Sequence, residues 1–208
     1  MAKINCKTNE TQILFKNPIL ERLTKTNGFT PLIIFLAVSL FFLITAIRFI
    51  GFNFSLVACF IGGIFLWTFT EYITHRFVFH MHIKNKTMDK FHYYIHGIHH
   101  SFPDDFRRLV LPLTLSIPLA FIFYYLFALI IPRSALYPVF SGFVLGYALY
   151  DTLHYMLHRY SFNNGILKYL KSKHMKHHFL SPSNYFGVTS PIWDKIFGTN
   201  SCVSVKKN

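Results

Sequence analysis

Charged residues are scarce in this chain of 208 residues, where they make up 14% of the sequence. A soluble domain averages about 25%, so the composition argues against a water-soluble globule. The three cysteines are scattered (Cys6, Cys59 and Cys202) and form no CxxC pair, which excludes a disulfide scaffold. No Ser-His-Asp or Cys-His set and no phosphate-binding glycine loop stands out. The sequence therefore offers none of the usual signatures of a soluble hydrolase or nucleotide-binding enzyme.

What the chain has instead is apolar surface, with 52% hydrophobic residues and 25 phenylalanines. The apolar residues gather in four runs that carry few or no charges. These runs cover 32–47, 52–70, 109–131 and about 135–150. Each is near the roughly 20 residues that a helix needs to cross a hydrocarbon core. We therefore expect an all-α integral membrane bundle of about four transmembrane helices.

The basic residues predict how this multi-pass bundle is oriented in the membrane. Of the 21 Lys and Arg, 19 lie in the two termini and the loop 71–108, and only Arg48 and Arg133 lie in the two short turns. Because cytosolic loops carry the excess of positive charge, both termini are expected in the cytosol. The membrane itself is expected to be the endoplasmic reticulum in a eukaryote or the plasma (inner) membrane in a bacterium. The net charge of +13 then follows from topology and contact with membrane lipid, so we expect no nucleic acid partner. We expect one domain over residues 1–208, with an N-terminal cytosolic or interfacial segment (1–31) and a transmembrane and catalytic core (32–200).

Histidine is the most informative residue type, with 12 copies that all lie outside the apolar runs. Two triples share the spacing i, i+3, i+4: His96, His99 and His100, and His174, His177 and His178. On a helix, the three imidazoles of such a triple share one face. His154 and His158 are four apart and also share a face. His75 and His80 are five apart, so they can share a site only if the helix ends or distorts between them.

The residues around these histidines support a buried metal site. Metal-bound imidazoles usually donate their other N–H to a carboxylate or carbonyl, and Asp151 and Glu71 each precede a histidine by one turn. Either carboxylate could equally be an ion partner at a helix end. His82 and His92 fall outside the main pattern, and their roles stay open.

Ten histidines in two triples and two pairs are too many for one metal ion but suit two ions with about five ligands each. An all-imidazole set suits Zn, Cu, Fe or Ni. A dinuclear site beside lipid could hydrolyse a bond or activate dioxygen against a C–H bond, and the phenylalanine-rich helices favour the second. A metal transporter would place histidine or acidic residues inside the apolar runs, and these runs contain none. A non-catalytic scaffold would not need ten convergent ligands.

At these same residues the chain resembles the membrane fatty acid hydroxylase superfamily, and most closely its fatty acid 2-hydroxylase branch. The resemblance covers most of residues 71–200 and rests on five stretches. They are EYITHRFVFHMH (71–82), HGIHHSFPDDFRRLVLP (96–112), GYALYDTLHYMLH (146–158), KYLKSKHMKHH (168–178) and NYFGVTSPIWDKIFGT (184–199). The HxxHH boxes and the final WDxxFGT are shared with sterol desaturases and carotenoid hydroxylases, so a sterol or carotenoid hydroxylase or desaturase is the alternative.

The resemblance implies a dioxygen-dependent monooxygenase that hydroxylates C2 of a long fatty acyl chain, as a free acid or within a ceramide-type sphingolipid. It implies dioxygen as co-substrate and two metal ions in a cytosolic helical cap, with iron expected for activity and zinc as an occupant in purified protein. It also implies ten ligands: His75, His80, His96, His99, His100, His154, His158, His174, His177 and His178. Tyr150 and Asp151 match a Tyr-Asp pair beside those ligands and are the candidate catalytic residues.

The chain departs from many members of this family in one respect. They carry an N-terminal cytochrome b5 domain, for which residues 1–31 are too short. We therefore expect a separate electron donor (cytochrome b5, ferredoxin or a reductase). The basic segment 168–176 could dock an acidic carrier or simply face the membrane. Arg107 and Arg108 could meet a substrate headgroup or lipid phosphates.

Overall fold

The computed structural model describes residues 13–80 and 93–201, and within them all regular structure is helical. The helices are α1 (Pro18–Leu23), α2 (Thr30–Ile50), α3 (Phe54–Ile73), α5 (Ile98–Ser101), α6 (Leu113–Ile130), α7 (Arg133–Arg159), α8 (Gly165–Phe179) and α9 (Ile192–Ile196). Two π-helical segments, η1 (Thr74–Phe79) and η2 (Tyr93–Gly97), extend α3 and lead into α5. The expected all-α class is confirmed.

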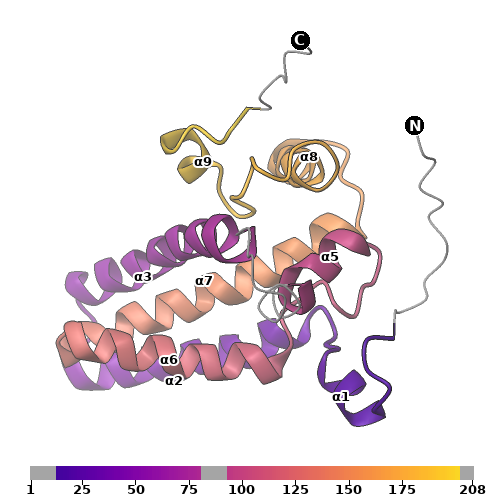
Figure 1. Ribbon diagram of the computed structural model, residues 1–208. Coiled ribbons are helices and arrows are strands. Elements are labelled where there is room, and N and C mark those ends of the chain that lie inside the picture. Colours follow the sequence, from indigo (N-terminus) through magenta and orange to yellow (C-terminus); the bar gives the residue numbers. More distant parts are fainter. Residues whose placement is uncertain (1–12, 81–92, 202–208) are drawn as a thin grey trace, which may run out of the picture.

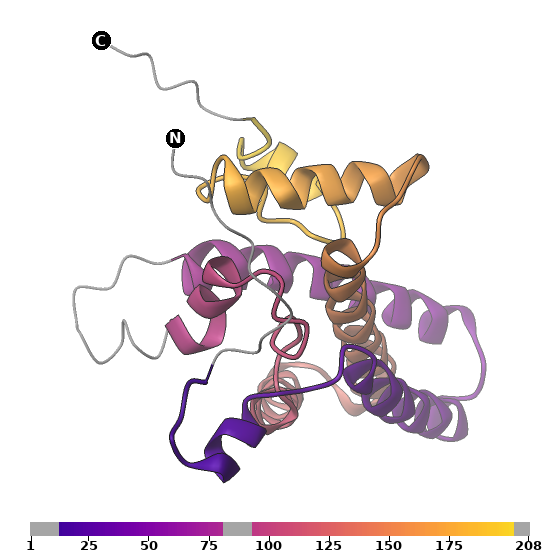
Figure 2. The ribbon, with the colours of Figure 1, turned by 90° about the vertical axis from the view of Figure 1, so that its right-hand side faces the viewer.

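Four long helices, α2, α3, α6 and α7, lie side by side and form the bundle (Figure 1). Helix α8 crosses one end of this bundle and is seen end-on in Figure 1 and along its length in Figure 2, with α9 beside it. The short α1 lies at the same end. The cap that the sequence predicts is thus α8, α9 and the segments that join them to the bundle.

Three of the four long helices are long and apolar enough to cross a membrane: Thr30–Ile50, α3 with η1 (Phe54–Phe79), and Leu113–Ile130. The fourth apolar run lies within α7, which continues beyond that run through His154 and His158 and reaches Arg159. α7 occupies the middle of the bundle and has buried residues along its whole length. About four spans were expected, and the described residues thus provide three by length and composition, with α7 packed among them.

Local signals in the sequence set the ends of these helices. The side chain of Asn53 caps α3 by accepting a hydrogen bond from the Leu56 amide (2.9 Å). Gly51, just after α2, has φ +72°, a conformation that glycine adopts at low cost. Pro112 and Pro132 directly precede α6 and α7. The turn between α2 and α3 and the turn between α6 and α7 therefore lie close to Arg48 and Arg133, where the sequence predicts them.

The α3–α7 contact is unusually close because glycines on both helices face the other backbone. A Cβ atom built on Gly63 would lie 2.1 Å from the carbonyl oxygen of Val139, and one on Gly142 would lie 1.9 Å from that of Phe60. Small residues allow such approach between membrane helices, where packing rather than hydrophobicity holds helices together. The contact matters for the site because α3 leads into His75 and α7 carries His154 and His158.

A pair of buried serines joins α2 to α7. The Ser141 hydroxyl donates to the Ser39 carbonyl (2.7 Å), the Ser39 hydroxyl donates to the Ser141 carbonyl (3.0 Å), and the two hydroxyls are 3.0 Å apart. Around this pair, aromatic side chains of α2, α6 and α7 form the main core. The core therefore fixes α7, and with it the histidines near its C-terminal end.

Candidate metal centre

The π-helix η1 brings His75 and His80 together. In a π-helix the backbone hydrogen bonds join residues five apart, so residues at i and i+5 come to the same side. The rings of His75 and His80 have centroids 5.1 Å apart. The distortion that the spacing of five requires is thus present, directly between the two residues.

The described histidines form two groups of five, each with nitrogen atoms within 4.8 Å of one another. The first group is His75, His80, His96, His100 and His177. The second group is His99, His154, His158, His174 and His178. The ten candidates of the sequence are all brought together, whereas His82 and His92 lie outside the described residues.

Each HxxHH triple contributes to both groups, which the helical face alone does not predict. His96 and His100 belong to the first group and His99 to the second, while His177 belongs to the first and His174 and His178 to the second. The groups are adjacent, since the rings of His100 and His178 stack with centroids 4.2 Å apart. Five bundle and cap segments (η1, η2, α5, α7 and α8) therefore converge on one double site.

Backbone carbonyls fix the orientation of three of these rings. His75 Nδ1 donates to the Phe186 carbonyl (2.6 Å), and His177 Nδ1 donates to the Asn184 carbonyl (2.7 Å). In the second group, His154 Nδ1 donates to the Leu109 carbonyl (3.0 Å). Because a carbonyl only accepts, the proton sits on Nδ1 and the lone pair on Nε2 points into the group. This is the arrangement in which histidine binds a metal ion.

The spacing of the nitrogen atoms fits a common ion in each group. His80 Nε2 is 3.2 Å from His96 Nε2 and 2.9 Å from His177 Nε2. In the second group, His174 Nε2 is 2.7 Å from His158 Nε2 and 3.1 Å from His178 Nε2. Two nitrogens held about 2.1 Å from one ion and about 90° apart are roughly 3 Å from each other. These nitrogen pairs therefore have the spacing of neighbouring ligands.

Burial makes this arrangement costly without a cation. His75 Nε2 and both ring nitrogens of His99 are buried and have no hydrogen-bond partner, and such groups carry a desolvation penalty of about 1–3 kcal/mol each. Burial, followed by the neighbouring histidines, lowers the pKa of His96, His99 and His174 well below 6.5. Burial and His100 lower the pKa of His177 to about 3. The rings are neutral at pH 7, which leaves their lone pairs available to metal.

The two carboxylates that the sequence places beside the ligands, Asp151 and Glu71, bond to groups near the ligands and not to the ligands themselves. Asp151 accepts hydrogen bonds from the Tyr147 hydroxyl (3.0 Å) and the Leu111 amide (3.4 Å), while the His154 partner is the Leu109 carbonyl. Glu71 accepts from the amides of Val188 (2.6 Å) and Thr189 (3.0 Å), next to the Phe186 carbonyl that binds His75. Neither carboxylate bonds directly to the histidine that follows it. Each histidine instead donates to a backbone carbonyl, and the carboxylate holds the segment that carries this carbonyl.

Sequence reasoning missed these carbonyls and a third carboxylate, Asp194, which is 2% exposed. Asp194 accepts from the amides of Phe186 (2.9 Å) and Gly187 (2.8 Å). Backbone acceptors leave no mark in a sequence. Asp194 does lie in the WDxxFGT stretch, and that was the available signal.

Tyr150 lies beside the second group, on the face of α7 that carries His154. Its ring is parallel to the His154 ring, with an interplanar angle of 2° and centroids 5.9 Å apart. It also contacts Trp67 of α3, with ring centroids 5.6 Å apart. Tyr150 thus lies between the packed bundle and the candidate ligands.

Arg108 is committed to the fold rather than presented to an anionic headgroup. It is 7% exposed and pairs with Asp105 (2.7 Å) and Glu21 (2.5 Å), which ties α1 to the segment before α6. Burial opposes a low pKa for Glu21, but bonds from Lys25, two backbone amides and Arg108 outweigh it and lower the pKa to about 2. The expectation of a headgroup contact is therefore not supported for Arg108, while Arg107 is exposed.

The lysines of α8 give this helix a basic surface, on which Lys168 is exposed and Lys171, Lys173 and Lys176 are half-buried. The amines of Lys168 and Lys171 donate to the carbonyls of Asn163 (3.1 Å) and Tyr160 (2.7 Å). The Lys173 amine lies over the Tyr185 ring, 4.5 Å from its centroid. This basic surface lies on the helix that supplies three candidate ligands to the two groups.

Comparison with known proteins places this arrangement in a family. Residues 60–199 match the model of the family described as fatty acid hydroxylase. A dihydroceramide fatty acyl 2-hydroxylase of Arabidopsis thaliana is 43% identical over 145 residues, which is 70% of this chain and 61% of that protein. A ceramide very long chain fatty acid hydroxylase of Schizosaccharomyces pombe is 39% identical over 89% of this chain and 54% of its own length. The human fatty acid 2-hydroxylase is 41% identical over 67% of this chain and 38% of its own length.

A solved structure of full-length Scs7p, in which only the hydroxylase domain is visible, has the same fold. Its TM-score is 0.85 at 36% identity, over 91% of this chain and 72% of that one. The chain thus spans less than two thirds of the length of the three relatives above, while it covers most of the visible hydroxylase domain.

Proposed function

Since the chain belongs to the fatty acid hydroxylase family, we propose that it hydroxylates C2 of a long fatty acyl chain, free or within a ceramide-type sphingolipid. The observation that carries this proposal is the pair of five-histidine groups at one end of an apolar helix bundle. The double site supplies the metal ligands, and the apolar helices place it beside lipid. The names of the relatives, which are fatty acyl and ceramide 2-hydroxylases, support this substrate class over a sterol or a carotenoid.

We assign the ten histidines of the two groups as ligands of two metal ions, with iron as the active metal and zinc as an inactive substitute. When bound, the two iron ions would supply the activation of dioxygen that insertion of oxygen into a C–H bond requires. The chain's own part is to present ten neutral imidazoles in fixed orientations. Its burial of the two groups also keeps bulk water from the reacting carbon.

Tyr150 and Asp151 have different parts in this proposal. Tyr150 lies against the His154 ring, so its hydroxyl is our candidate for moving a proton or holding the polar end of the substrate. Asp151 already accepts two hydrogen bonds from the chain, so its part is to hold the segment that orients His154. Replacing Tyr150 by phenylalanine keeps the ring and removes only the hydroxyl. This variant therefore tests the role of the hydroxyl apart from the packing of the ring.

Hydroxylation with dioxygen consumes two electrons and two protons for each product and water formed. We propose that a separate electron donor (cytochrome b5, ferredoxin or a reductase) delivers them to the cap. The lysines of α8 offer a positive surface for an acidic carrier. A charge-reversed α8 (Lys168→Glu with Lys176→Glu) should raise the KM for such a donor several-fold, and the effect should shrink as salt is added.

Three helices that are long and apolar enough to cross a membrane support an integral membrane protein. We propose that residues 32–200 form its single membrane and catalytic core, with both termini and the double site on the cytosolic side. The proposed membrane is the endoplasmic reticulum in a eukaryote or the plasma (inner) membrane in a bacterium. Cysteine labelling from either side of sealed vesicles tests this topology.

The test of function is lipid mass spectrometry of a host that expresses the wild type beside His99→Ala, with iron and a compatible reductase supplied. We expect products that are one oxygen heavier, with the hydroxyl at acyl C2, in the wild type only. Hydroxylated or desaturated sterols or carotenoids would move the chain to another branch of the family. Product from His99→Ala at the wild-type level would refute the ligand assignment.

A further inference from the structure

The two histidine groups take their backbone support from different parts of the chain. In the first group, His75 and His177 donate to carbonyls of one segment, residues 184–189, at Phe186 and Asn184. In the second group, His154 donates to Leu109, just before α6. Loss of one support should therefore disturb one group and leave the other in place.

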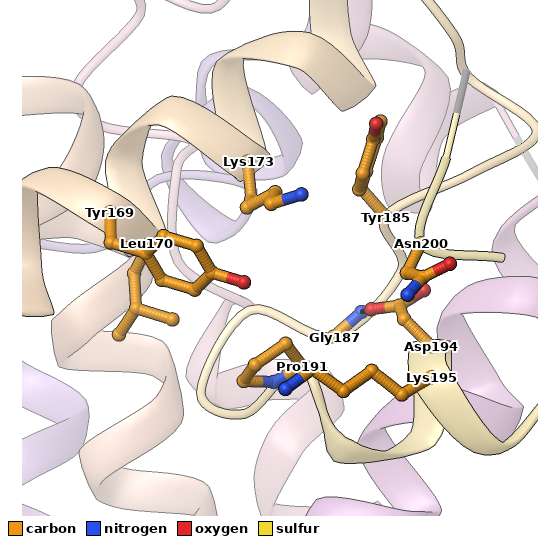
Figure 3. Close-up of a pocket in the computed structure, with 9 residues that line it drawn as sticks. All are labelled: Tyr169, Leu170, Lys173, Tyr185, Gly187, Pro191, Asp194, Lys195 and Asn200. Atoms are coloured by element: carbon orange, nitrogen blue, oxygen red, sulfur yellow. Dashed lines mark hydrogen bonds between the residues drawn. The ribbon is translucent and has the colours of Figure 1, made fainter.

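The segment 184–189 is held from behind by carboxylates rather than by regular secondary structure. Asp194 accepts hydrogen bonds from the amides of Phe186 and Gly187, and also from the Thr199 hydroxyl (2.7 Å). Figure 3 shows the Asp194 carboxylate against Gly187, at the edge of a small pocket that Tyr185 and Lys173 also line. Each amide that Asp194 holds lies within one residue of the carbonyl that orients His75.

Tyr185 shows that this segment would not keep its shape unaided. It has φ +61°, the left-handed conformation that a residue with a side chain rarely adopts. Such conformations are unfavourable and persist only where the surroundings over-determine them. Here the Tyr185 amide donates to the Thr199 carbonyl (2.9 Å) and Lys173 lies over its ring. The flanking carbonyls of Asn184 and Phe186 are the two that accept hydrogen bonds from His177 and His75.

We propose that Asp194 is a positioning residue for the first histidine group alone, and that Asp151 is its counterpart for the second. Asp194 acts through the 186–187 amides on the carbonyl that holds His75. Asp151 acts through the Leu111 amide on the segment that presents the Leu109 carbonyl to His154. This inference rests on the proposed function, because it assumes that each group binds one ion.

The test measures metal content, not activity. The purified chain in detergent is loaded with Fe²⁺ and dialysed against a buffered chelator at a concentration that leaves the wild type with both ions. Loss of a partner that orients a ligand typically weakens metal affinity about 10–100-fold. We therefore expect about one ion per chain in Asp194→Asn and also about one in Asp151→Asn.

Double variants identify which ion is lost. Asp194→Asn combined with His177→Ala should still hold about one ion, because both changes act on the first group. Asp194→Asn combined with His174→Ala should hold almost none, because each change empties a different group. Asp105→Asn is the matched control, since Asp105 is a buried carboxylate that bonds to Arg108 instead. It should lower the unfolding temperature but keep two ions.

Two results would overturn the proposal. One is an Asp194→Asn protein that keeps both ions, and the other is one that loses both while its unfolding transition stays cooperative. If Asp194→Asn does not fold, Glu71→Gln loosens the same segment at Val188 and Thr189 and must give the same pattern. A folded wild type that binds fewer than two ions would instead contradict the proposed function, so the two failures are distinguishable.

Discussion

Replacing Gly63 by alanine should destabilise the protein, while the same change at the neighbouring Gly62 should not. A Cβ on Gly63 would lie 2.1 Å from the Val139 carbonyl oxygen, well inside the 3.0 Å that real contacts respect, whereas one on Gly62 meets nothing within 4 Å. The obstacle at Gly63 is backbone, so no side chain can rotate away, and α3 and α7 must separate. Both variants gain the same helix propensity, up to about 1 kcal/mol. The difference between them therefore isolates the cost of overpacking, about 1–3 kcal/mol.

The assay is thermal unfolding of both variants in the same detergent. For a chain of this size, 1 kcal/mol corresponds to roughly 2–4 °C, so Gly63→Ala should unfold roughly 2–12 °C below Gly62→Ala. Gly63→Ala should also bind less metal, because a shift of α3 displaces His75 from the other ligands of the first group. Equal unfolding temperatures would refute the reasoning, since they would mean that the close α3–α7 approach does not hold the bundle together.

Three further predictions concern polar contacts. Ser141→Ala should cost about 0.6–1.7 kcal/mol, and Ser39→Ala should add little to it in a double-mutant cycle; full additivity would show that the serines do not interact. Because the pKa of Glu21 is lowered to about 2, its stabilisation should be complete above pH 4.5 and fade as the pH falls towards 2. Hydrogen exchange of the two amides that Glu21 binds should therefore rise in acid, corrected for intrinsic rate, and Glu21→Gln should show that rise at pH 7; protection unchanged in the variant would count against it. Arg108→Met should cost about 3–5 kcal/mol, because it leaves the buried carboxylate of Asp105 unpaired, and a change confined to substrate KM would restore the headgroup role.

Much of the site could be predicted from the sequence because metal ligands obey strict spacing. The HxxHH triples, the pair on α7 and the need for a distortion between His75 and His80 all follow from helical geometry. The division of each triple between two groups does not, because it depends on how α5 and α8 face each other across the cap. The partners of the ligands could not be predicted either, since a backbone carbonyl such as that of Phe186 has no sequence signature.

The bundle was predictable to a similar depth. Apolar runs locate the helices, yet α7 continues well beyond its run, because its last turns are buried under the cap rather than in lipid. The role of Arg108 was out of reach because its partner Glu21 lies 87 residues away. Contacts of that kind are fixed by the tertiary fold, which local patterns do not encode.

The most direct test of the central claim follows the atoms at C2. Purified wild type, loaded with iron and supplied with an electron donor, is given a very long acyl substrate that carries two deuterium atoms at C2, under ¹⁸O₂. We predict a product that has lost one deuterium and gained one ¹⁸O at that carbon. Retention of both deuterium atoms, or oxygen derived from water, would contradict the account.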